Sequence, residues 1–141
     1  MYTVRDLLEA EAERLGIEHL GRGDLEAMRA DLRMQERAIE DRDAVEMIAA
    51  NRRFHFTIFE RCPNAWLLRF VTQLWDALDP YRVLSYRRMW IEDPDGRVPN
   101  EIVAEHERIV AALEKRRFER AAGLLARHRR RSEAFLRELS P

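Results

Sequence analysis

Apolar residues recur along this chain at the three- and four-residue spacing of amphipathic helices. No segment shows the two-residue alternation that is typical of a strand. Short connections make consecutive helices antiparallel, so we expect an all-α antiparallel bundle of about six to seven helices. The pattern predicts helices at about residues 2–15, 24–40, 43–62 and 64–90, a fifth that starts near residue 100, and a sixth over 117–138.

Local residue choices support these boundaries. Asp43 and Glu46 form a plausible capping box at the start of the third helix, and Asn64 is a good N-cap for the fourth. Pro80 is expected to kink or end the fourth helix, because proline lacks the backbone N–H of a helix interior. The Glu92–Gly96 segment combines Pro and Gly with acidic residues and predicts a loop.

Three histidines lie on apolar faces of different predicted helices. His55, His106 and His128 each occupy a core position of the helical pattern, and Asn51 lies one turn before His55 on the same face. A buried imidazole without a partner costs about 1–3 kcal/mol, so three of them call for a common explanation. The fourth histidine, His19, lies among turn glycines and is expected at the surface.

A shared metal ion is the simplest explanation for these positions. Imidazole nitrogens suit zinc, nickel and similar divalent transition metals, and three of them leave coordination positions open for a small ligand. The alternative is a buried polar network in which each histidine bonds to Asn51, to tyrosines or to carboxylates. The spacing alone favours the metal only slightly over this network.

Composition narrows the classes of protein that fit. The chain has 141 residues, enough for one domain with a real core, and 46% of them are hydrophobic. Charged residues make up 36% but balance to a net charge of −1, which argues against a DNA-binding surface over the whole chain. The start of the chain has no apolar signal region, no apolar run could span a membrane, and Cys62 is the single cysteine. These features favour a cytoplasmic protein without disulfides.

Four motifs together resemble one known family, and they cover essentially the whole chain. They are the opening helix from Val4, the run Asn51-Arg-Arg-Phe-His55 followed by Asn64-Ala-Trp, the segment Glu105-His106 to Leu113, and the final helix from Ala121 to His128. In this order they resemble the FCD domain, the C-terminal ligand-sensing domain of FadR-type GntR transcriptional regulators. The resemblance implies a single FCD-like domain over residues 1–141.

The resemblance also implies roles for individual residues. It makes His55, His106 and His128 ligands of one divalent transition metal, and it places Asn51 where the family usually has an aspartate ligand. An amide oxygen can coordinate a cation but carries no charge, so Asn51 is either a weak ligand or an effector contact. Family members of this kind bind small organic acids, self-associate as dimers and contact DNA through an N-terminal winged helix-turn-helix. Nothing in this chain resembles that DNA-binding domain, so a fragment of a longer repressor is favoured over a free-standing sensor.

Arginine is the natural partner for a carboxylate effector. Arg5 shares the inward face that we assign to the first helix, and Arg82 lies beyond the inward positions of the fourth helix. We expect these two arginines to contact the effector, whereas Arg127–Arg131 are expected to form a solvated face. The inward face of the first helix is expected to comprise Val4, Leu8, Ala12 and Leu15.

Two other functions stay open from the sequence. A three-histidine helical bundle can be a metal-dependent hydrolase or transferase, but such an enzyme needs a positioned general base. Glu105 points about 100° away from the adjacent His106 on a helix, and Glu9 is a remote candidate. We therefore expect no enzyme. The third possibility is a dimerisation domain whose metal site is inactive.

Overall fold

The computed structural model describes residues 2–139 and contains six helices, with no strand among these residues. This confirms the expected all-α antiparallel bundle. The helices are α1 (Tyr2–Ile17), α2 (Arg22–Glu40), α3 (Ala44–Phe59), α4 (Ala65–Glu92), α5 (Arg97–Glu114) and α6 (Phe118–Arg137).

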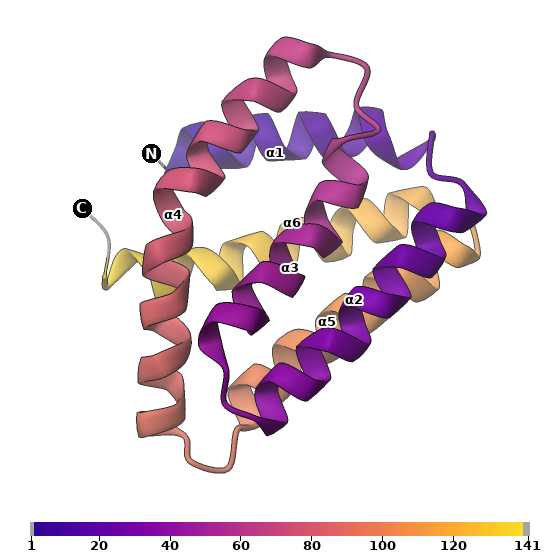
Figure 1. The fold of residues 1–141 in the computed structure, drawn as a ribbon. Coiled ribbons are helices and arrows are strands. Elements are labelled where there is room, and N and C mark those ends of the chain that lie inside the picture. The colour runs from indigo at the N-terminus through magenta and orange to yellow at the C-terminus, as the bar shows by residue number, and fades with distance from the viewer. Residues whose placement is uncertain (1, 140–141) are drawn as a thin grey trace.

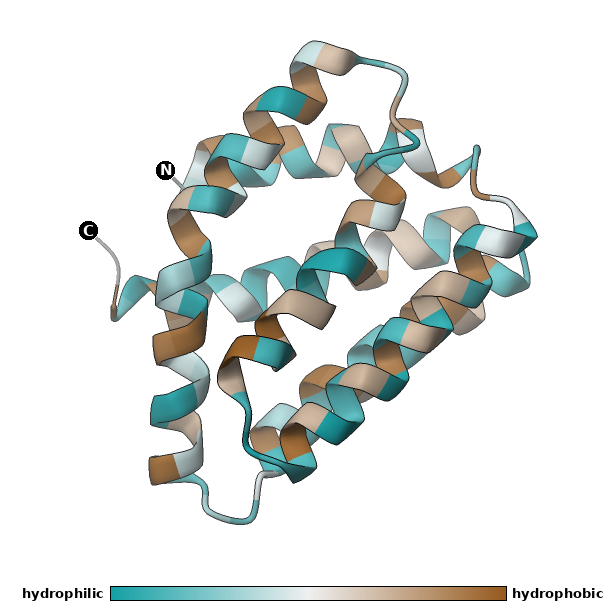
Figure 2. Ribbon diagram, viewed as in Figure 1, coloured by the Kyte–Doolittle hydropathy of each residue, from teal (hydrophilic) through white to brown (hydrophobic). Residues whose placement is uncertain are grey.

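Helix α3 lies at the centre of the bundle. Figure 1 shows α3 between α4 on one side and the antiparallel pair of α2 and α5 on the other, with α1 and α6 crossing behind it. In Figure 2 hydrophobic and hydrophilic residues alternate around each ribbon, as the amphipathic pattern predicts. The larger apolar cluster fills the space among α2, α3, α5 and α6, and includes Met28, Phe54, Ile58, Ile109 and Leu125. A smaller cluster around Phe59, Val71 and Trp75 joins α1, α3 and α4.

The predicted caps are present. Asp43 accepts a hydrogen bond from the Glu46 backbone N–H at 3.0 Å, and Asn64 accepts one from Leu67 at 3.1 Å. Helix α5 begins three residues earlier than expected because Asp93 Oδ2 accepts the Val98 N–H at 2.8 Å. This contact satisfies a donor of the first turn, which sequence periodicity does not reveal.

Pro80 does not end the fourth helix. Helix α4 continues through it to Glu92, and the ribbon in Figure 1 changes direction partway along α4. A kink was one of the two outcomes that the sequence allowed at this residue.

Charged residues, not apolar ones, occupy much of the inward face of α1. Val4 was expected inside, but its side chain is 49% exposed, while Arg5, Glu9 and Glu13 are buried. The expectation that Arg127–Arg131 form a solvated face is also wrong for Arg129, which is buried. Its guanidinium donates to Asp6 and to Glu13, each at 2.7 Å. Mutual pairing explains why these charges lie inside, and it fixes α1 against α6.

The end of α1 approaches α3 closely at Gly16. A Cβ atom added to Gly16 would lie 2.2 Å from the carbonyl oxygen of Ile58, a backbone atom that cannot turn aside. Glycine is required at this position because the two helices touch here through their backbones.

We predict that Gly16→Ala lowers the free energy of unfolding by about 1–3 kcal/mol, because the added methyl group forces α1 and α3 apart. Gly123→Ala is the matched control, since a Cβ at Gly123 in α6 meets no atom within 4 Å. Helix propensity should make that variant about 0.5–1 kcal/mol more stable. Urea denaturation followed by circular dichroism measures both effects. Equal stability of the two variants would contradict the close contact.

Candidate metal centre and effector pocket

Three imidazoles from three helices meet in the interior. His55 comes from α3, His106 from α5 and His128 from α6, and all three are buried. His106 Nε2 lies 3.3 Å from His55 Nε2 and 3.0 Å from His128 Nε2. One ligand atom from each ring falls within 4.8 Å of the other two, a grouping that could hold a metal ion.

These separations fit a small transition metal. Nitrogen ligands at 2.0–2.1 Å from a tetrahedral zinc ion lie about 3.3–3.4 Å from one another. The His55–His106 distance of 3.3 Å matches this value, and the His106–His128 distance of 3.0 Å is slightly shorter. These two distances and the imidazole chemistry of the donor set suit zinc, nickel or a similar ion, and the third separation lies within 4.8 Å.

Two side chains orient the rings from behind. His106 Nδ1 lies 2.7 Å from Gln35 Oε1, and His128 Nδ1 lies 2.6 Å from Glu105 Oε2. Both partners are acceptors, so each Nδ1 carries the proton and each Nε2 directs its lone pair toward the centre. Hydrogen bonds of this kind fix the tautomer of metal-binding histidines in proteins.

Sequence reasoning missed Gln35 and the role of Glu105. Glu105 does point away from His106, as expected, but it reaches His128 on the neighbouring helix instead. Gln35 is fully buried on α2, between the core residues Leu32 and Ile39. The signal that identified the histidines, a polar residue on an apolar stripe, was present at Gln35 as well.

The environment keeps the imidazoles of His55 and His106 neutral. Burial lowers the pKa of His55 well below its ordinary value, and the neighbouring His106, His128, Arg82 and Arg5 lower it further. Burial, assisted by His128, also lowers the pKa of His106 well below its ordinary value. Neutral imidazole is the form that binds metals, so the rings need not lose a proton near neutral pH.

A cavity of about 40 Å³ opens beside the histidines. Asn51, which is buried, lines it together with His55 and His128, and both expected effector residues, Arg5 and Arg82, lie in its wall. Its lining residues are Arg5, Ile48, Asn51, His55, Trp75, Arg82, Ser85, Tyr86, Met89, Ile102, His128, Ser132, Phe135 and Leu136. Two arginines and no aspartate or glutamate are among them.

Both arginines have a buried nitrogen without a partner. Arg5 donates from Nε to Glu9 at 2.6 Å, but its Nη1 has no hydrogen-bond partner. Arg82 donates from Nη1 to Asp79 at 2.7 Å, its guanidinium carbon lies 3.9 Å from the centre of the Trp75 ring, and its Nη2 has no partner. Burial and the charge of Arg5 lower the pKa of Arg82 to about 10, so Arg82 remains protonated at neutral pH.

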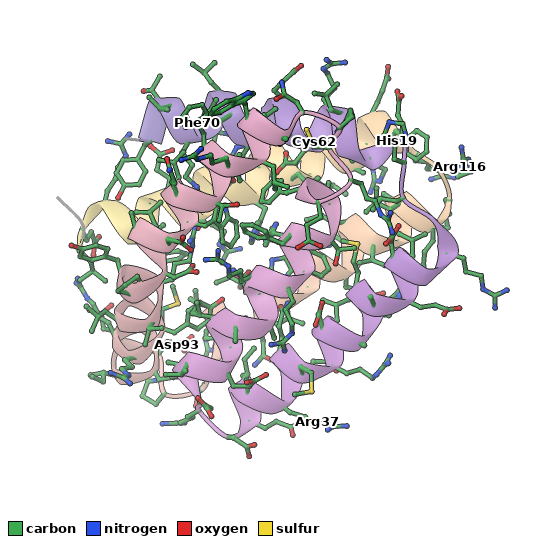
Figure 3. The ribbon with its side chains drawn as sticks, turned by 45° about the horizontal axis from the view of Figure 1, so that its top comes forward. His19, Arg37, Cys62, Phe70, Asp93 and Arg116 are labelled. Atoms are coloured by element: carbon green, nitrogen blue, oxygen red, sulfur yellow. The ribbon has the colours of Figure 1, made fainter. Side chains whose placement is uncertain are left out.

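His19 lies outside this centre. It is exposed in the turn after α1, as expected, and Figure 3 labels it at the periphery of the molecule. Among residues 2–139, no helix is long and apolar enough to cross a membrane.

Comparison with known proteins places this fold. The model of the FCD domain family matches residues 1–131, whereas the comparison with curated proteins gave no match. The solved structure of E. coli McbR/YncC aligns with a TM-score of 0.82 and 25% sequence identity, covering 98% of this chain and 66% of that chain. A GntR-family transcriptional regulator from Pseudomonas syringae pv. tomato str. DC3000 aligns with a TM-score of 0.75 and 24% identity, covering 98% and 54%.

This chain therefore spans less than two thirds of the length of either structure. The family model, in contrast, covers nearly all of it, from the opening helix to Arg131 near the end of α6. The chain belongs to the FCD domain family, the ligand-sensing domains of GntR-type transcriptional regulators.

Proposed function

We propose that this chain is a metal-dependent sensor of small carboxylates, which acts within a cytoplasmic bacterial regulator of transcription. The observation that carries the proposal is the convergence of three buried Nε2 atoms beside a cavity that two arginines line. The ligands of the metal would be His55, His106 and His128, with Asn51 as a weaker fourth donor.

A cation accounts for an otherwise unfavourable arrangement. The Nε2 atoms of His106 and His128 lie 3.0 Å apart while acceptors hold the proton of each ring on Nδ1. Two lone pairs at this distance repel each other unless a cation lies between them. When bound, a zinc or nickel ion supplies open coordination positions for carboxylate oxygens.

The arginines supply the complementary half of an anion site. Arg5 Nη1 and Arg82 Nη2 are buried donors without partners, and an unpaired buried donor costs about 1–3 kcal/mol. A carboxylate in the cavity would accept from one or both of them. Asn51 and the Ser85 hydroxyl also line the cavity and offer further hydrogen bonds.

The enzyme alternative has less support. Glu9 accepts hydrogen bonds from Arg5 and from the Trp75 indole at 2.9 Å, so it is held as a structural anion. Glu105 is likewise engaged by His128 and by Arg131. A general base must be free to accept a proton from the substrate, and neither carboxylate meets that condition.

Regulation of DNA binding is the natural output of such a sensor. We propose that this domain controls the DNA affinity of a winged helix-turn-helix domain outside this chain. We further propose a homodimer. Exposed aromatic residues support self-association, because Trp66 and Phe70 lie one turn apart on α4 and remain 65% and 48% exposed.

We predict that His106→Ala lowers the zinc affinity by at least about 100-fold, because it removes one of the three imidazole ligands. Isothermal titration calorimetry measures the affinity, and the zinc-induced rise in melting temperature should disappear with it. His19→Ala is the matched control and should bind zinc like the unmodified protein. Zinc binding that survives His106→Ala in a folded protein would place the metal elsewhere.

We predict that Arg82→Gln weakens the binding of acetate to the zinc-loaded protein by about tenfold or more, since a hydrogen bond to a charged group is lost. Zinc affinity measured without acetate should not fall, because Arg82 is no ligand. Arg88→Gln is the control, as Arg88 lies on the exposed face of α4 and pairs with Glu92. Equal acetate affinity in both variants would exclude Arg82 from the effector site.

A further inference from the structure

The charges around the pocket have an unusual balance. A divalent ion on the three histidines would face only neutral donors, because imidazole and the Asn51 amide carry no charge and no carboxylate lines the cavity. The two arginines in the wall are each paired with a carboxylate outside the cavity lining, Arg5 with Glu9 and Arg82 with Asp79. These pairs leave no net negative charge to offset a divalent ion, and burial removes most of the water that would otherwise screen that ion.

Each carboxylate that bonds a pocket residue accepts hydrogen bonds from two donors and forms an ion pair with an arginine. Glu9 bonds Arg5 and also the Trp75 indole. Asp79 accepts from Arg82 through one oxygen and from Arg52 through the other, at 2.7 and 2.6 Å. These anions therefore have little negative potential left with which to compensate a cation in the cavity.

The third such carboxylate behaves in the same way. Glu105 receives the Nδ1–H of His128 through one oxygen and Arg131 through the other, at 2.6 and 2.5 Å. It orients a ring of the centre from behind, and its charge is shared with a guanidinium. The three histidines are thus well arranged for a metal in geometry but poorly compensated in charge.

Resting on the proposed sensor function, we propose that Asn51 makes metal binding and carboxylate binding at this site mutually dependent. A divalent cation binds tightly only when a small carboxylate occupies the cavity, and the carboxylate binds tightly only when the cation is present. The carboxylate supplies the negative charge that the cavity lining lacks. It also accepts hydrogen bonds from the unpartnered Nη atoms of Arg5 and Arg82.

Thermodynamic linkage makes this dependence reciprocal. If the carboxylate raises the affinity for the cation by some factor, the cation raises the affinity for the carboxylate by the same factor. An aspartate at position 51 would break the dependence, because it has nearly the shape of asparagine but brings its own negative charge. Because Asn51 is neutral, the site binds the cation and the carboxylate tightly only when both are present.

The experiment uses the whole chain, with zinc as the metal and acetate as the carboxylate. Acetate is among the smallest carboxylates, as a cavity of about 40 Å³ requires, and acetamide is its uncharged counterpart of nearly the same shape. Zinc affinity is measured by competition with a chromophoric chelator, with excess acetate or acetamide at constant ionic strength. The proteins are the unmodified chain, Asn51→Asp, and Asn64→Asp as a control that adds the same charge at an exposed position and can still accept the Leu67 N–H.

We expect acetate, but not acetamide, to raise the zinc affinity of the unmodified chain and of Asn64→Asp by at least about tenfold. Acetate affinity, measured with and without zinc, should change by the same factor. Asn51→Asp should bind zinc at least about tenfold more tightly than the unmodified chain without acetate, and acetate should then add less than about twofold. Circular dichroism confirms that each variant is folded.

Each other result has a distinct meaning. Tight zinc binding that is equal with acetate and acetamide would overturn the dependence but leave the metal sensor in place. The same acetate effect in Asn51→Asp as in the unmodified chain would overturn the role of Asn51. Zinc binding to no variant under any condition would overturn both this inference and the proposed function.

Discussion

The meeting of three imidazoles in the core is the constraint on which the rest of this structure depends. His55, His106 and His128 come from three helices, and their Nε2 atoms approach to 3.0 and 3.3 Å. Apolar side chains at these positions would pack in the core without needing hydrogen-bond partners. The fold instead holds polar rings in fixed tautomers by means of Gln35 and Glu105, and burying these polar groups costs stability.

A second set of buried charges connects this centre to the outer helices. Arg129 on α6 binds Asp6 and Glu13 on α1, and Glu9, one turn before Glu13, binds both Arg5 and the Trp75 indole of α4. Helix α1 is therefore held by ion pairs that also determine where the Arg5 guanidinium lies. The same buried ion pairs therefore determine both the packing of α1 and the shape of the pocket wall.

Periodicity and residue type predicted the helices, their main caps and the inward position of the histidines, because these depend on neighbours within one helix. They placed Arg5 on the inward face, but they did not predict that Glu9 and Glu13 are buried. Val4 had the more hydrophobic side chain, yet Glu9 and Glu13 lie inside, since Glu9 bonds the Trp75 indole of α4 and Glu13 bonds Arg129 of α6. Glu105 was judged only against His106, and its true partner, His128, lies on another helix. Pairs between helices form only in the assembled bundle, so the residue pattern of one helix cannot predict them.

The position of the pocket also indicates how a ligand could act on the whole bundle. Arg5 belongs to α1, His55 to α3, Arg82 to α4 and His128 to α6, so a ligand that contacted all four would join four helices at once. Such a ligand changes the packing of these helices only to the extent that it binds one packing arrangement more tightly than another. The spare donors of Arg5 and Arg82 provide that difference, because their positions relative to the imidazoles depend on how α1 and α4 pack against α3. A change in the angle of either helix would alter the affinity for the ligand, and by linkage the ligand would stabilise one angle.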